Sequence, residues 1–277
     1  MPKTSLLSLL VLTSLLSVSA GAAPGARLWQ LWDASAESNP AGIDHAQWQR
    51  FLDLYLAVGD DGVNLVKYGR VDVEDRQRLQ SYLQMLSALD PRDYARAEQL
   101  AYWVNLYNAL TVKVVLSYPS KASILRMGRR WLSIGPWNDE MITIAGEPVT
   151  LNDIEHRILR PIWNDRRIHY ALNCASLSCP NLDPQAYTRA NSERLLTANE
   201  IAYINHPRGV RFDDQGRLVV SRIYQWYALD FATDRRGLLD YLSEHQSFHN
   251  NDLGTYNGRI VYDYDWALNK LESVRRE

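Results

Sequence analysis

The chain has 277 residues, with 30 lysines and arginines against 32 aspartates and glutamates, so its formal net charge is −2. Hydrophobic residues make up 46% and charged residues 22%, which is ordinary for a globular protein. This composition excludes a disordered chain, a collagen-like repeat and a strongly basic nucleic-acid binder, so no nucleic-acid partner is expected. Tyrosine (16) and tryptophan (9) outnumber phenylalanine (4), which predicts many aromatic rings at core edges or along a cleft.

The N-terminal segment has the pattern of a secretory signal peptide. Lys3 precedes an apolar run over residues 6–18, and the small-residue sequence VSAGAA follows it. The run is short for a bilayer span, so cleavage after Ala20 or Ala22 is expected, with residues 1–22 as the signal peptide. The protein is therefore predicted to be secreted, most simply into a bacterial periplasm.

The first half of the chain has mainly helical periodicity. Another long apolar stretch, residues 101–118, contains Asn105, Asn108 and Lys113, which would be costly in lipid. It is expected to be a buried helix, and no membrane span is expected after signal cleavage. Helices are predicted over residues 45–57 (capped by Asp44), 73–89 and 94–116, with an extended piece over 63–68.

The second half mixes helical and extended patterns, which predicts one α+β domain over residues 23–277 with its core at about 60–270. Its helix-rich first half would pack on a small, mainly antiparallel sheet. Hairpins are predicted at 141–150 and 210–220, a helix at 151–159 ending before Pro161, a buried strand at 168–173, helices at 192–204, 223–231 and 237–244, and an extended segment at 259–264.

The densest polar cluster is RIHYALNCASLSCP, residues 167–180, which contains the two cysteines of the chain, Cys174 and Cys179. A thiol at the end of a strand, where a loop turns into a helix, can meet helical N–H groups that lower its pKa and hold an oxyanion. This arrangement suits a cysteine nucleophile, provided that a histidine can reach the thiol. Cys174 is the predicted nucleophile and Cys179 the reserve.

His156 and His169 are the candidate general bases. His169 lies five positions before Cys174, so on a regular strand the two side chains would point to opposite faces. This favours His156 as the base, with His169 as the reserve. Glu155 and Asn105 are candidates for orienting the imidazole or for donating to an oxyanion. Asn105 and Asn108 share a helix face, and capping of neighbouring loops explains them equally well.

Two alternatives to a nucleophile remain for the cysteines. In an oxidising compartment, a Cys174–Cys179 disulfide that pins the loop is an equally strong interpretation. A metal site formed by His169, Cys174 and Cys179, with or without His156, is weaker because the spacing does not match common zinc sites. No metal or cofactor is therefore expected. Arg160 is expected to pair with a partner elsewhere in the fold, with the binding of a substrate carboxylate as the alternative.

Several ordered segments of the chain resemble domain-of-unknown-function family 547, which occurs in bacteria and eukaryotes. Its reaction is not established, so the resemblance transfers no residue role. The family pattern is similar to papain-like or transglutaminase-like thiol enzymes with the histidine placed before the cysteine, which is an analogy only. The resemblance is carried by AYWVNLYNA (101–109), LNDIEHRILR (151–160), residues 167–180, SRIYQWY (221–227) with Asp230 and Phe231, and YDWALN (264–269).

Two hypotheses follow for function. The first is a secreted cysteine-dependent hydrolase or acyltransferase that acts on amide or ester bonds in the cell envelope. Its substrate would be a small molecule, a peptide or a glycan. The second is a non-catalytic envelope module with a structural Cys174–Cys179 disulfide, which binds a peptide, glycan or protein partner through an aromatic cleft. A hydrogen bond between His156 and a cysteine sulfur would favour the first, and two bonded sulfurs would favour the second.

Overall fold

The computed structural model describes residues 23–129, 134–246 and 253–271. The predicted signal peptide, residues 1–22, lies outside these ranges. Within them, no helix combines the length and the apolar character that crossing a bilayer requires.

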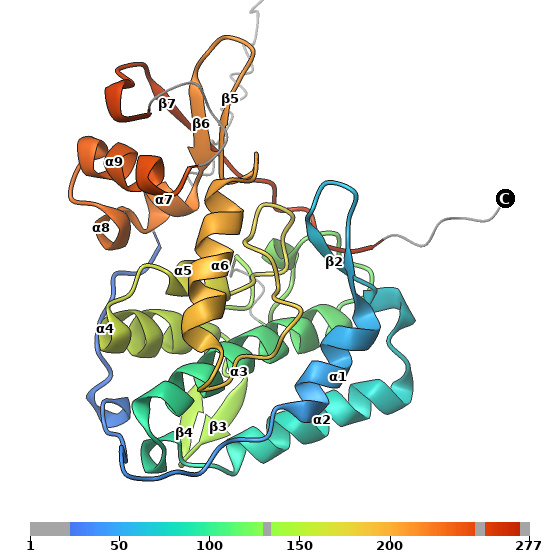
Figure 1. The fold of residues 1–277 in the computed structure, drawn as a ribbon. Helices are drawn as coiled ribbons and strands as arrows, with labels where there is room; N and C mark the ends of the chain where they lie inside the picture. The colour runs from blue at the N-terminus through green and yellow to red at the C-terminus, as the bar shows by residue number, and fades with distance from the viewer. Residues whose placement is uncertain (1–22, 130–133, 247–252, 272–277) are drawn as a thin grey trace, which may run out of the picture.

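Three helices form the first half, as the periodicity predicted: α1 (Ala46–Tyr55), α2 (Val73–Ser87) and α3 (Arg96–Ser117). They lie side by side, α1 against α2 and α2 against α3 (Figure 1). The Asp44 carboxylate accepts the Ala46 N–H at 2.8 Å, but the N-cap residue of α1 is His45, so Asp44 lies one position before the cap that it was predicted to form. A short hairpin of β1 (Leu56–Val58) and β2 (Asn64–Val66) joins α1 to α2. Single turns are η1 (Gln30–Trp32), η2 (Tyr68–Arg70), η3 (Pro91–Asp93) and η4 (Ile124–Arg126).

Helix α3 is buried on nearly every side, as its apolar sequence predicted. Asn105, which is fully buried, donates from Nδ2 to the Tyr187 carbonyl at 2.7 Å and accepts the Tyr187 N–H at 3.0 Å. Both polar groups of its amide are therefore satisfied. The contact ties α3 to the loop that leads into α6 (Ser192–Ile204).

The second half contains both predicted hairpins. β3 (Ile142–Ile144) pairs with β4 (Glu147–Val149) across Ala145 and Gly146, both at positive φ. β5 (Val210–Phe212) pairs with β6 (Leu218–Ser221), and β7 (Ile260–Asp263) adds to β6 in parallel. The structure is thus mixed α+β, but its strands form three separate small sheets instead of the one sheet expected. α9 (Arg235–His245) and the turn η6 (Leu253–Thr255) pack beside the third sheet.

Buried side chains form two hydrophobic clusters. The larger surrounds α3 and includes Trp103, Leu106 and Leu110 together with residues of α1 and α2. The smaller lies at the end of the molecule formed by the third sheet and α9 (Figure 1), and its members include Val220 and Leu239. The cavity described below lies where segments from both clusters meet.

The strand predicted over residues 168–173 is wrong. Residues Ile168–Ala171 form a single helical turn, α5, and only Leu172 is extended. All four residues of the turn are buried, and a short apolar run that is buried on all sides lacks the alternation that separates a strand from a helix. The argument that placed His169 and Cys174 on opposite faces of a strand therefore no longer applies.

The helix that was expected to end before Pro161 continues past it. A π-helical segment, η5 (Asp153–Leu159), runs directly into α4 (Arg160–Trp163). The Arg160 N–H donates to the Glu155 carbonyl five residues back, the wider spacing of a π-turn. Proline has no backbone N–H, so no donor at position 161 is left without an acceptor where the turn is wide. The helix predicted over residues 223–231 is likewise two single turns, α7 (Ile223–Trp226) and α8 (Ala228–Phe231).

The Asn105 contacts predict a large stability effect. We expect Asn105→Ala to lower the free energy of unfolding by about 2–4 kcal/mol, because it leaves the N–H and C=O of Tyr187 buried without partners. Urea unfolding measures the loss. Gln80→Ala, an amide deletion at an exposed position of α2, is the matched control and should change stability little. Equal stabilities of the two variants would contradict this role of Asn105.

Candidate functional site

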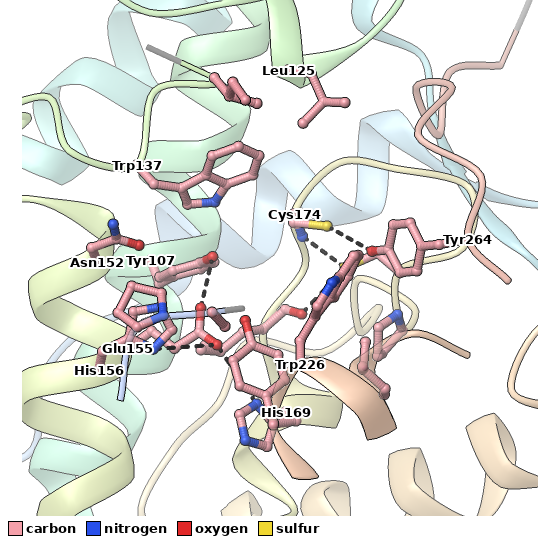
Figure 2. A pocket seen from close by; sticks show the side chains of 18 of the residues that line it. Tyr107, Leu125, Trp137, Asn152, Glu155, His156, His169, Cys174, Trp226 and Tyr264 are labelled. Atoms are coloured by element: carbon pink, nitrogen blue, oxygen red, sulfur yellow. Dashed lines mark hydrogen bonds and ion pairs between the residues drawn. The ribbon is translucent and has the colours of Figure 1, made fainter. Parts of the chain in front are cut away.

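A cavity of about 550 Å³ lies between α3, η5, α7 and the loop over residues 172–180 that contains both cysteines (Figure 2). One part of its wall is polar and the rest is mostly apolar and aromatic. The polar part contains Glu155, His156, His169 and Cys174. The apolar part includes Leu125, Ile134, Trp137, Leu172, Ile223, Trp226 and Trp266.

Buried amides hold the backbone on both sides of Cys174. Asn108 of α3 donates to the Ala171 carbonyl at 2.9 Å and accepts the Asn173 N–H at 2.8 Å. The Asn173 side chain accepts the Ala175 N–H at 2.9 Å and donates to the Pro180 carbonyl at 2.8 Å. Ala175 has φ of +60°, a left-handed conformation that is costly for alanine and requires such support. The loop therefore holds Cys174 in a defined position.

The Cys174 sulfur lies among hydroxyl groups. Its Sγ is 3.1 Å from the Tyr264 hydroxyl and 3.2 Å from Ser176 Oγ, and Ser176 Oγ donates to the Tyr264 oxygen at 2.9 Å. Burial raises the pKa of the Cys174 thiol, but hydrogen bonds from Cys179, Ser176 and Tyr264 outweigh it, so this pKa lies below its ordinary value. The site therefore favours the thiolate of Cys174.

Cys179 is the buried neighbour of this thiolate. Its Sγ accepts the Cys174 N–H at 2.9 Å. Burial raises the pKa of Cys179, and the negative charge of Cys174 raises it further, so this thiol keeps its proton. Both cysteines are free, and the disulfide of the second hypothesis is not present in the structure.

A buried ionic network fills the other polar side of the cavity. Arg160 binds Asp230 through two parallel contacts, Nε to Oδ2 at 2.6 Å and Nη2 to Oδ1 at 2.9 Å, so the expected ion pair is present. Asp230 also contacts His169 Nε2 at 2.7 Å. The other nitrogen of His169, Nδ1, lies 3.6 Å from Glu155 Oε1. His156 Nδ1 lies 3.0 Å from Arg160 Nη1 and 3.9 Å from Glu155 Oε1.

The network keeps Glu155 ionised. Burial by itself would raise the pKa of Glu155, but the adjacent His156 and His169 and a hydrogen bond from Tyr227 lower it to about 2. Tyr107 of α3 donates a further hydrogen bond to Oε2 at 3.2 Å. His169 stacks on Tyr227 with ring centroids 4.0 Å apart, which fixes the plane of the imidazole. Glu155 thus lies between the two histidines, with its Oε1 3.9 Å from His156 Nδ1 and 3.6 Å from His169 Nδ1.

The protonation of His156 follows from its contact with Arg160. A guanidinium nitrogen only donates, so Nδ1 of His156 must be the acceptor and the ring proton lies on Nε2. Burial lowers the pKa of His156, which keeps the imidazole neutral. In this form Nε2 is a donor and cannot take a proton from Cys174.

The predicted site residues thus fall into two groups, those that line the cavity and Asn105, which does not. Cys174, Cys179, Glu155, His156 and His169 line one cavity. In the described part of the chain, no hydrogen bond joins Cys174 Sγ to either histidine; its side-chain oxygen partners are Tyr264 and Ser176. Asn105 binds the Tyr187 backbone and does not line the cavity.

The π-helical segment shapes this wall of the cavity. π-turns are rare, and they occur often at functional sites. The irregular turn frees carbonyl groups, and the chain before α1 pairs with them: the His156 carbonyl accepts the Arg27 N–H and the Arg157 carbonyl accepts the Trp29 N–H, both at 2.9 Å. The chain before α1 also brings Pro24 to the cavity, where the Pro24 carbonyl accepts a hydrogen bond from Arg160 at 2.7 Å.

Sequence reasoning had assigned no role to Tyr264, Ser176, Tyr227 or Asp230. Tyr264, Tyr227 and Asp230 lie in the segments that carry the family resemblance, which was the available signal. The contacts of these three residues join positions far apart in the sequence, so the spacing of residues along the chain could not predict them. Among the described residues, no three histidine, cysteine, aspartate or glutamate side chains converge as a metal-binding group.

Residues 91–204 match the model of a family described as "Protein of unknown function, DUF547". The match includes α3, η5, both cysteines and α6, but ends before Asp230 and Tyr264. A curated relative is the genome polyprotein of Ilheus virus, 36% identical over 76 residues. That overlap covers 27% of this chain, which spans 2% of the viral protein. No solved structure matches the chain.

The lowered pKa of Glu155 predicts an acid-sensitive stability. A carboxylate whose pKa is lower in the folded state than in the unfolded state stabilises the fold above its ordinary pKa of 4.5, and the effect is lost as the pH falls towards about 2. We expect unfolding midpoints in urea to fall over this range by the equivalent of about 3 kcal/mol more in the wild type than in Glu155→Gln. Glu140→Gln, at an exposed position, is the control and should keep the wild-type slope. Parallel slopes for wild type and Glu155→Gln would exclude this assignment.

Proposed function

We propose that this protein is a thiol-dependent hydrolase or acyltransferase that acts on ester or amide bonds, with Cys174 as the nucleophile. The observation that carries the proposal is the position of the Cys174 sulfur: it lines the cavity, it contacts the hydroxyl groups of Ser176 and Tyr264, and its pKa is lowered. A thiolate is the reactive form of cysteine, and lowering its pKa increases the fraction present at neutral pH.

The reaction would begin with attack of Cys174 Sγ on the carbonyl carbon of the substrate. A thioester forms and the alcohol or amine leaves, taking a proton. Ser176 and Tyr264 form a hydroxyl pair in contact with the sulfur, and their position suits this proton transfer. Water or an acceptor nucleophile then releases the acyl group from Cys174.

His156 has a different role here from that of a general base. Its Nε2 carries a proton because Arg160 occupies Nδ1, so it suits donation to the substrate carbonyl oxygen, where negative charge develops. Glu155, Asp230 and Arg160 are positioning residues, which hold both histidines in a fixed orientation.

The cavity walls favour a substrate with an apolar group. Trp137, Trp226 and Trp266 stand together, with ring centroids 5.8 Å apart between Trp137 and Trp266 and 5.4 Å between Trp226 and Trp266. A volume of about 550 Å³ lies within the usual range for small-molecule sites. The same walls also favour the second candidate, a module that only binds such a ligand.

The signal-peptide pattern leads us to propose that either activity takes place outside the cytoplasm. The activity would belong to one domain over residues 23–277, related to thiol enzymes of the papain or transglutaminase kind.

Covalent labelling tests the assignment of Cys174. We expect a β-lactone or aryl-ester probe to acylate the wild-type protein at Cys174, and Cys174→Ala to lose the label while unfolding at the same temperature. Cys179→Ala is the matched control and should retain it, because Cys179 keeps its proton. Intact mass and peptide mapping measure the label. Undiminished labelling of Cys174→Ala would refute the proposal, and an unlabelled wild type that still binds apolar ligands would leave the binding module.

Removal of the Tyr264 hydroxyl tests how the thiolate is stabilised. We expect Tyr264→Phe to raise the pKa of Cys174 by about one unit, because the thiolate loses a donor at 3.1 Å. The rate of alkylation by iodoacetamide, followed across a pH series, should fall at neutral pH and recover at higher pH. Tyr118→Phe, outside the cavity, is the control. A profile identical to that of the wild type would show that Tyr264 does not stabilise the thiolate.

A further inference from the structure

We propose that Cys174 and Cys179 also form a redox pair that reduces organic hydroperoxides, with Cys174 as the thiol that is oxidised and Cys179 as the thiol that resolves it. This activity goes beyond acyl transfer, although both depend on a reactive Cys174.

The geometry of the loop separates the two roles. Both cysteines line the cavity, but Cys174 is half-buried, whereas Cys179 is only 4% exposed. The two residues are in direct contact, because the Cys174 N–H donates to Cys179 Sγ at 2.9 Å. The Cys179 thiol donates to the Leu172 carbonyl at 3.6 Å, which holds its sulfur next to the Cys174 backbone. A ligand in the cavity thus meets Cys174 first, and an oxidised Cys174 already has a protonated thiol beside it.

The anchoring of the loop supports formation of a bond between these sulfurs. Asn108 and Asn173 fix the backbone before Cys174, and the Asn173 amide spans the loop to the Pro180 carbonyl. Pro180, which follows Cys179, is thereby held to Asn173, which precedes Cys174. The two ends of the loop stay together without a covalent link, so a disulfide would close a loop whose ends are already held side by side.

The reaction balances with a hydroperoxide as the only oxidant. The Cys174 thiolate attacks the terminal oxygen of ROOH, the O–O bond breaks, and Cys174 becomes a sulfenic acid. The departing alkoxide takes one proton from the Ser176–Tyr264 hydroxyl pair, which solvent replaces, and leaves as ROH. Cys179 then attacks the Cys174 sulfur and its proton leaves with the hydroxyl as water. The pair is oxidised by two electrons to a disulfide, which an external dithiol reduces.

The walls beside Cys174 favour a hydroperoxide with an apolar group over hydrogen peroxide. Tyr264, whose hydroxyl contacts the sulfur, packs against Trp226 and Trp266 with ring centroids 4.8 Å and 4.6 Å apart. Figure 2 shows Trp226 and Tyr264 on the same side of Cys174. An aryl or alkyl group bound on these rings would place its peroxide oxygens near the sulfur and its two hydroxyl donors.

Oxidation of the reduced full-length protein by one equivalent of cumene hydroperoxide tests the proposal. We expect the wild type to lose the mass of two hydrogen atoms, with a Cys174–Cys179 disulfide found by peptide mapping, and dithiothreitol to reverse the change. The reaction should be at least about 10-fold faster than that of free cysteine. It should also be faster with cumene hydroperoxide than with hydrogen peroxide. Trp226→Ala should reduce this preference.

Two variants separate the roles of the thiols. Cys179→Ser should stop at the sulfenic acid of Cys174, which dimedone traps, and Cys174→Ser should react no faster than free cysteine. A wild type that reacts no faster than free cysteine would overturn the proposal, as would a sulfenic acid that never becomes a disulfide. Either failure with normal acyl labelling of Cys174 would leave the proposed acyl transfer intact. Since the mass and the disulfide map need only the wild type, the test stands even if a variant does not fold.

Discussion

The burial of α3 on nearly every side is the constraint on which the rest of the structure depends. An amide on such a helix is costly unless both of its polar groups have partners. Asn105 and Asn108 satisfy this requirement with backbone groups of two distant loops. One of these loops leads into α6 and the other carries Cys174. The position of the candidate nucleophile is therefore set by the polar requirements of the central helix.

The same principle explains the ionic network on the other side of the cavity. The network consists of Glu155, the Arg160–Asp230 pair and two histidines. It contributes little net stability, because the free energy of removing several charges from water offsets much of their mutual attraction. Its main effect is to orient the side chains. Each imidazole nitrogen that contacts Arg160 or Asp230 is assigned a donor or acceptor role, so the faces that the rings present to the cavity are fixed.

The cavity thus brings together two chemically different halves. The thiolate of Cys174 is stabilised by the Tyr264 hydroxyl, which itself accepts from Ser176, whereas the histidines are held by carboxylates and by Arg160. This differs from a cysteine–histidine pair, in which the imidazole itself activates the thiol. A nucleophile stabilised by hydroxyl groups, facing a neutral histidine donor and aromatic walls, suits attack on a polarised bond in a small apolar ligand.

Sequence by itself determined the helices of the first half, both hairpins and the identity of the polar cluster, because these depend on local periodicity, turn residues and composition. It also indicated that Asn105 and Asn108 needed partners. Tertiary structure alone decided what those partners were, that residues 168–171 form a helical turn, and that η5 continues past Pro161 as a π-helix. It also placed Tyr264 on the Cys174 sulfur and Asp230 on His169, 90 and 61 positions apart in the chain. The physical reason is that burial on all sides removes the alternation by which sequence separates a strand from a helix, and that a hydrogen bond between distant segments leaves no trace in their spacing.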